Sequence, residues 1–141
     1  MARSRNTYWA LGLGLAILVS GVGCTDSSGP APVAKIDAVR AYLCSQPGLS
    51  TCVSRGQLIA AGNLPPANEA FQVWAFYKGW VTTNWRLLYG QDSLITEKLA
   101  SDSSYVWLNF NGAGAKTYTI YVAIRGAAGI LSQDSLRWTF P

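Results

Sequence analysis

The chain has 141 residues, of which 50% are hydrophobic and 13% charged, so its composition excludes a disordered protein and suits one domain of ordinary size. Its formal net charge of +4 includes Arg3 and Arg5, which lie in a segment expected to be removed; nine basic and seven acidic residues then remain. The remaining basic residues are scattered singly, which argues against nucleic-acid binding. The absence of histidine removes the commonest general base and the commonest metal ligand.

Residues 1–23 have the pattern of a secretory signal peptide. Arg3 and Arg5 precede an apolar run over residues 8–19, and small residues follow it up to Cys24. The run is shorter than the roughly 20 residues that a spanning helix needs.

A cysteine directly after small residues resembles the lipobox of bacterial lipoproteins. In that family the cysteine is lipidated and becomes the mature N-terminus, so the resemblance implies lipidation of Cys24 and a membrane-anchored location in the cell envelope. Gly21 stands where the motif usually has leucine. Secretion after cleavage near Gly21 or Gly23, and an uncleaved N-terminal anchor, are the alternatives.

Three cysteines are an odd number for an exported protein. If Cys24 carries lipid, Cys44 and Cys52 remain as a pair, and an oxidising compartment permits one disulfide. Pro47 and Gly48 indicate a turn between them, which would place both sulfurs across the base of a hairpin. The spacing is too long for a redox-active Cys-x-x-Cys motif, so we predict a structural disulfide.

Residues 24–33 are predicted to be the lipidated cysteine and a flexible linker, because residues 25–32 are small, polar and proline-bearing. Residues 34–141 are the predicted domain. Its first segment, residues 35–44, matches helical as well as strand spacing, and the disulfide argument favours a strand. Loops or turns are expected at residues 62–68, 90–92, 101–104, 111–115 and 126–129. Strands are predicted at residues 35–44, 52–61, 70–80, 81–89, 105–110, 117–126 and 135–140, with a short edge strand or irregular crossing at 93–99.

The most regular of these segments is residues 117–126. Tyr118, Ile120, Val122 and Ile124 alternate with other residues at a period of two, which is typical of a strand with one buried face. We therefore expect it to be the central strand. Residues 70–80 carry aromatic side chains on both faces, so one set is expected in the core and the other partly exposed or covered by a neighbour.

Short strands separated by glycine-rich turns predict an all-β protein, an antiparallel sandwich of about seven to eight strands. The alternation from Tyr118 to Gly126, followed by a final strand, resembles the last strand pair of immunoglobulin-like and fibronectin type III domains. This resemblance implies an immunoglobulin-like β-sandwich. The predicted disulfide departs from the immunoglobulin pattern, in which the bridge joins the two sheets.

The sequence contains no nucleophile elbow, phosphate loop or zinc spacing. Its carboxylates are dispersed and mostly at predicted turns, which is typical of solvated surface charges. Calcium held by Asp92 and Asp102, or a hydrolytic pair of carboxylates, is the alternative. We expect no enzymatic activity, no metal and no cofactor.

The informative excess is aromatic. Beyond the signal segment there are more Trp, Tyr and Phe side chains than one core requires, and some are expected to form a second, exposed face. Two functions suit such a face: interaction with another envelope protein or with a second copy of the chain, and, as the alternative, carbohydrate binding or adhesion on a flat aromatic platform. The candidate binding surface comprises Trp74, Trp80, Trp85, Tyr89, Trp107 and Tyr121, with Tyr105 as a further member.

Overall fold

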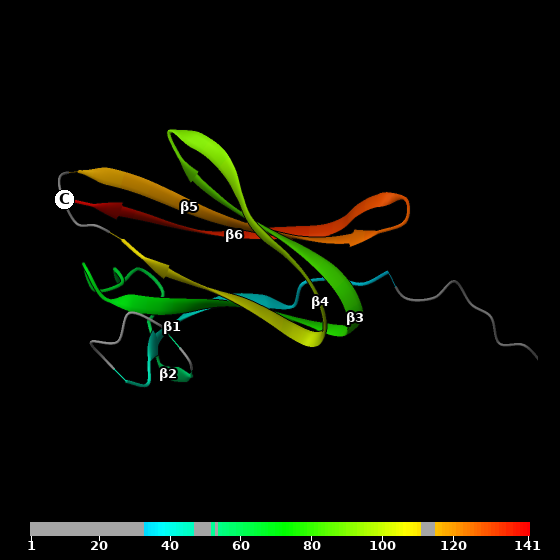
Figure 1. Ribbon diagram of the computed structural model, residues 1–141, viewed down its shortest axis with the longest axis horizontal. Coiled ribbons are helices and arrows are strands. Elements are labelled where there is room, and N and C mark those ends of the chain that lie inside the picture. The colour runs from blue at the N-terminus through cyan, green and yellow to red at the C-terminus, as the bar shows by residue number, and fades with distance from the viewer. Residues whose placement is uncertain (1–32, 47–51, 53, 111–114) are drawn as a thin grey trace, which may run out of the picture. The chain divides into compact units, whose positions relative to one another are not determined.

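The computed structural model describes residues 33–46, 52, 54–110 and 115–141. The predicted signal segment, Cys24 and most of the linker lie outside the described residues. Residues 32–141 form one compact unit. The described residues of this unit form six strands and no helix (Figure 1). The strands are β1 (Ala38–Cys44), β2 (Arg55–Leu58), β3 (Ala70–Tyr89), β4 (Gln91–Asn109), β5 (Lys116–Gly126) and β6 (Gly129–Phe140).

All the pairings are antiparallel, and β3 is the strand that connects the rest. One edge of β3 pairs with β4 along almost its whole length. The other edge pairs with β1 over residues 71–76 and then with β5 over residues 82–88. β2 extends the sheet beyond β1, and β6 extends it beyond β5. The prediction of an all-β antiparallel fold is confirmed.

A bend divides β3 and β4 into two halves. Between the pairs Phe76–Ser103 and Trp80–Ser101, β3 has three residues and β4 has one, which is a β-bulge. Gly79 and Asp102 have positive φ angles of 78° and 64°, a region that glycine and aspartate tolerate better than most residues. The Asp102 carboxylate accepts a hydrogen bond from the Gly79 N–H at 2.9 Å, so the bend is joined across the two strands. Figure 1 shows the β3–β4 hairpin curving back on itself here.

The core lies between the two halves of this folded sheet. The inward residues of the first half include Phe71, Val73 and Ala75, all fully buried. Those of β5 are Tyr118, Ile120, Val122 and Ile124, which are the four that the alternating pattern predicted. An aromatic cluster joins the halves: the ring of Phe71 packs edge-on against Trp138 of β6 at 5.6 Å, and Phe110 stacks on Tyr118 at 4.0 Å.

Several sequence-based boundaries were wrong. Residues 70–80 and 81–89, predicted as two strands, are one strand of 20 residues, and residues 93–99 and 105–109 belong to one strand of 19. Residues 101–104, predicted as a turn, lie within β4 at the bend. The central position belongs to β3, while β5 lies between β3 and β6. The physical reason is that the bulge interrupts the β3–β4 ladder only between Phe76–Ser103 and Trp80–Ser101, so the two strands bend there and pair again beyond it.

The first segment and the disulfide were predicted correctly. Residues 38–44 form a strand and not a helix. Cys44 and Cys52 are at disulfide distance, with their Cα atoms 5.4 Å apart. The second predicted strand, residues 52–61, is shorter than expected, because only Arg55–Leu58 pairs with β1.

Candidate functional site

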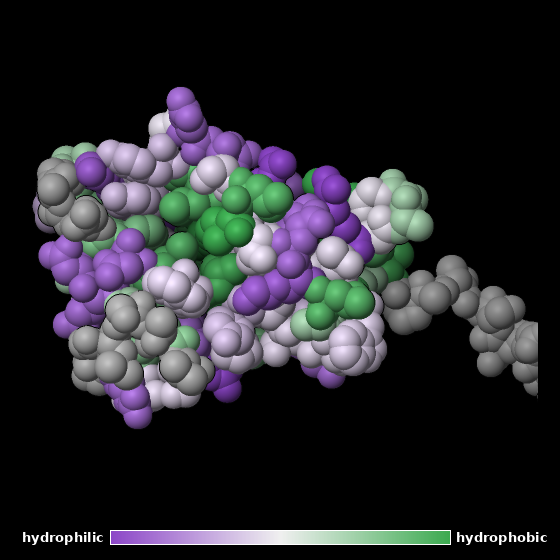
Figure 2. Space-filling view, in the orientation of Figure 1, coloured by the Kyte–Doolittle hydropathy of each residue, from purple (hydrophilic) through white to green (hydrophobic). Residues whose placement is uncertain are grey.

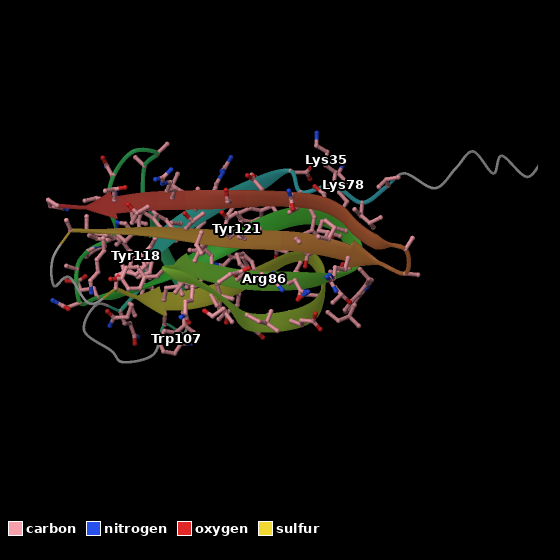
Figure 3. All side chains as sticks on the ribbon, turned by 90° about the horizontal axis from the view of Figure 1, so that it is seen from above. Lys35, Lys78, Arg86, Trp107, Tyr118 and Tyr121 are labelled. Carbon is pink, nitrogen blue, oxygen red and sulfur yellow. A yellow bond between two sulfur atoms is a disulfide. The ribbon has the colours of Figure 1, made fainter. Side chains whose placement is uncertain are left out.

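The six predicted binding residues do not form one surface. Trp85 is fully buried, whereas Trp80 is 72% and Trp107 48% exposed. Trp74 and Trp107 lie on the outer face of the first half of the sheet, and Tyr121 lies on the outer face of the second half. Figure 3 shows Tyr121 beside Arg86 and well apart from Trp107. Tyr89, at the end of β3, stacks on the core residue Tyr118 at 4.7 Å.

Trp85 was assigned wrongly because residues 81–89 were treated as a separate strand. Its indole N–H donates a hydrogen bond of 3.0 Å to Ser104 Oγ, and Thr83 Oγ1 lies 2.9 Å from the same oxygen. These three side chains form a buried polar cluster beside the bend. Had the alternation that begins at Phe71 been continued through the bend, position 85 would have been predicted to face inward. The bulge preserves this phase, because inward positions are odd-numbered on both sides of it.

The outer face of the first half is largely covered by the chain itself. The ring of Trp74 stacks on Tyr105 at 4.6 Å, and the Arg55 guanidinium of β2 lies 4.7 Å from the centre of the Trp74 ring. The same guanidinium lies 5.0 Å from the Tyr42 ring and 5.7 Å from the Phe76 ring. A cation over aromatic faces is attracted by their negative face potential. Arg55, which the sequence pattern did not single out, thus caps most of this aromatic group.

Gln72 is fully buried on this outer face, and both polar atoms of its side chain have a hydrogen-bond partner within the chain. Its Nε2 donates to the Cys52 carbonyl at 3.0 Å, and its Oε1 accepts from the Trp74 indole N–H at 2.8 Å. The disulfide to Cys44 holds Cys52 near Gln72. The bridge therefore does more than close a hairpin, because it keeps a carbonyl over a buried amide.

The outer face of the second half carries an apolar strip, defined here as Trp80, Leu94 and Leu99. Their exposed fractions are 72%, 56% and 69%. Trp80 pairs with Ser101, and Leu99 lies two residues before Ser101 on β4, so the two side chains are diagonal neighbours on one face. Leu94, opposite Arg86, lies farther along the same edge. Figure 2 shows apolar side chains gathered in the middle of one face of the molecule and, beyond a band of hydrophilic side chains, a second apolar group beside the bend of β3 and β4.

The same half contains a groove of about 270 Å³ at its centre. Asn84 faces Ala123 of β5 across the sheet, and Arg86 faces Tyr121. Arg125 of β5 and Gln133 of β6 also line the groove. Only 7% of Asn84 is exposed, and its Oδ1 is the one buried side-chain polar atom without a hydrogen-bond partner among the described residues. No sequence pattern predicted this groove, because it depends on the pairing of β3 with β5.

The charged side chains of the groove and of the bend have different partners. Arg86 forms an ion pair of 2.9 Å with Asp92, and both side chains are about half exposed. Arg125 has no ion-pair partner among the residues that the structure describes. Near the bend, hydrogen bonds from Gly79 N–H and Ser101 Oγ hold the pKa of the Asp102 carboxyl below its ordinary value. Burial raises the pKa of the Tyr77 hydroxyl and lowers that of the Lys98 ammonium group.

Comparison of the chain with protein-family models, with curated proteins and with solved structures found no match. In the described part of the chain no three His, Cys, Asp or Glu side chains come together as a metal site would require, and Asp92 and Asp102 contact different partners. The same part of the chain also contains no helix of the length and hydrophobicity needed to span a membrane.

Proposed function

We propose that this protein is a non-catalytic lipoprotein domain of the bacterial cell envelope, anchored through Cys24, that associates with other proteins and first of all with a second copy of itself. The finer fold that we propose is an immunoglobulin-like sandwich made by the folded sheet. The observation that carries the functional proposal is the apolar strip Trp80, Leu94 and Leu99 beside an unpaired strand edge. Trp80 and Leu99 are neighbouring, strongly exposed apolar side chains on one face, and such a pair favours a protein partner.

The edge of β4 supports pairing with another strand. β4 pairs only with β3 along its 19 residues, so the N–H and C=O groups of its other edge are without strand partners in the described sheet. Such an edge is a template for strand addition. The bulges near Arg86 and at Asp102 limit the regular stretch to about residues 96–101.

A second copy is the partner that these features fit best. Two β4 edges can pair antiparallel about a two-fold axis, which places an identical strip on each side of the junction. β4 carries charges of both signs, including Glu97 and Lys98, so two copies do not repel through a single sign of charge. A lipid anchor on each copy would confine both to one membrane surface and raise their effective concentration.

The test is chemical crosslinking of the full-length protein in intact membranes. We expect a crosslinked dimer, and we expect Leu99→Asp to abolish it, because a charge at the junction would have to be desolvated. Leu64→Asp is the matched control, since Leu64 is a comparably apolar, 42% exposed residue in the loop before β3. Recovery of monomer alone from the wild-type protein would contradict the proposal, as would equal loss of dimer in the control.

Carbohydrate binding is the second candidate function. It is favoured by Trp107, which is 48% exposed and lies on the same outer face as the Trp74–Tyr105 stack. The coplanar platform of Trp80, Trp85 and Trp107 is not available, because Trp85 lies in the core. A carbohydrate site therefore needs polar groups in addition to a single exposed ring.

A further inference from the structure

We propose that the groove centred on Asn84 binds a hydroxylated carboxylate of the size of one sugar ring, namely a uronic acid. The proposal deepens the carbohydrate-binding candidate and rests on it, and it is independent of self-association through the apolar strip. Its starting point is the buried amide oxygen of Asn84, which has no partner among the described residues.

The Asn84 side chain lines the groove, but its Oδ1 exposes less than 1 Å² to solvent, so a ligand pairs with this oxygen only after the side chain turns. An unpaired buried amide oxygen costs about 1–3 kcal/mol, and that pairing would recover this cost. A hydroxyl group can either donate or accept a hydrogen bond, and it satisfies the Asn84 amide in either orientation. A polyhydroxylated ligand meets this requirement directly.

The groove exists because a small residue lies at its centre. Ala123 is directly opposite Asn84, and the next outward residues along β5 are Tyr121 and Arg125. The two large side chains rise on either side of a methyl group, and Ile130 and Gln133 of β6 close the far side. The volume of about 270 Å³ lies just below the roughly 300–1,000 Å³ of pockets for drug-sized ligands, so a single ring is the fitting size.

The side chains around Ala123 match the two kinds of surface on a uronic acid. The ring of Tyr121, 39% exposed, can pack against the apolar C–H face of a sugar. Arg125 offers a planar set of donors that fits a carboxylate in a bidentate manner. Figure 3 shows Arg86 and Tyr121 on neighbouring strands, and both residues line the groove.

The charges of the lining favour an acidic over a neutral sugar. Two arginines, Arg86 and Arg125, line the groove with one carboxylate, Asp92, which is already paired with Arg86. Glu97 lies opposite Asn84 on β4 but is not part of the lining. Arg125 is therefore the group expected to hold the ligand carboxylate, and Arg86 and Asp92 can contact hydroxyl groups.

The experiment is titration of the full-length protein in detergent with galacturonic acid, its linear tetramer, galactose and acetate, followed by calorimetry and by NMR of the Asn84 side-chain amide. We expect saturable binding of galacturonic acid, with galactose and acetate each at least about 10-fold weaker, since each loses one charged or several polar contacts. Tighter binding of the tetramer would identify a polysaccharide as the source, whereas equal binding would identify the free sugar acid.

Variants separate this site from the rest of the protein. Asn84→Leu and Arg125→Gln are each expected to weaken galacturonic acid at least about 10-fold, and Arg125→Gln to remove the preference over galactose. Arg40→Gln, an exposed arginine on the outer face of the first half, is the matched control and should bind as the wild type does. The Asn84 amide resonance of the wild-type protein should shift on binding, and this readout does not depend on a variant folding.

Three results would overturn the assignment: no saturable binding, binding that Asn84→Leu leaves unchanged, or an equal loss in Arg40→Gln. Binding of the tetramer that depends on Trp107 but not on Asn84 would keep the carbohydrate-binding candidate while rejecting this groove. Absence of binding by every sugar would reject both.

Discussion

Two amide side chains, Gln72 and Asn84, occupy comparable places in the two halves of β3. Both lie at outward-facing positions of the central strand and both are more than nine-tenths buried. Gln72 finds its partners within the chain, in the Cys52 carbonyl and the Trp74 indole. Asn84 Oδ1 has none among the described residues. One half of the sheet thus pairs its buried amide within the chain, whereas in the other half the amide that lines the groove keeps an unpaired, buried oxygen.

The difference has a local cause. In the first half, β2 and the disulfide bring Cys52 and Arg55 over the outer face of the sheet. In the second half, β5 and β6 extend the sheet, and the small side chain of Ala123 leaves the groove in its outer face. We propose that the paired amide has a structural role and that the unpaired amide has a role in recognition. The predictions below test that distinction.

The largest effect on stability is expected from removing the disulfide that holds Cys52 over the outer face of the first half. Replacing Cys44 and Cys52 together by serine should destabilise the protein by about 2–3 kcal/mol, as the chain-entropy description gives for a loop of this length. Loss of the cover over Gln72 would add to this. Urea denaturation of the variant and of the reduced and oxidised wild-type protein measures it. Equal stability in all three samples would show that the Cys52 segment does not hold the first half together.

The matched replacements Gln72→Leu and Asn84→Leu sharpen the comparison most directly. Gln72→Leu leaves the Cys52 carbonyl and the Trp74 N–H without partners and should cost about 1–3 kcal/mol. Asn84→Leu removes an unpaired buried group and should change the free energy of unfolding by less than about 1 kcal/mol, in either direction. Denaturant titrations without added sugar provide both values. If Asn84→Leu were as destabilising as Gln72→Leu, Asn84 would have a structural role, and the contrast between the halves would fail.

The smallest effect concerns the bend between the halves and is a pH dependence. The pKa of Asp102 is lower in the folded protein than its ordinary value of 3.8, because Gly79 and Ser101 donate hydrogen bonds to the carboxylate. The ionised form therefore favours folding. Its contribution is complete above pH 3.8 and is lost as the pH falls through the lower, folded pKa.

Asp102→Asn keeps a residue that tolerates positive φ but removes this titration. We expect its stability to fall less than that of the wild-type protein between about pH 5 and pH 2, measured by denaturation at each pH. Glu69→Gln is the control, because it removes an exposed carboxylate for which the described residues show no hydrogen bond or ion pair. Parallel curves for Asp102→Asn and the wild-type protein would contradict a role for this carboxylate at the bend.

The sequence alone determined the all-β class, the inward residues of β5 and the pairing of Cys44 with Cys52. Each of these depends on local information: a period of two along one strand, and two cysteines that flank a turn. The lipobox-like site at Cys24 and the envelope location are also sequence-based, and they remain predictions. The inward position of Trp85 was within reach of the same reasoning, because the alternation that begins at Phe71 resumes in the same phase beyond the bend.

Only the tertiary structure decided how the outward faces are used. The bend at Gly79 and Asp102, the capping of Trp74 by Arg55, the partners of Gln72 and the hollow over Asn84 all depend on which strands lie side by side. Strand pairing joins residues that are distant in the sequence, such as Asn84 and Ala123, and no local periodicity encodes that register. For this reason the sequence could identify a surplus of aromatic side chains but could not separate those that complete the fold from those that remain exposed.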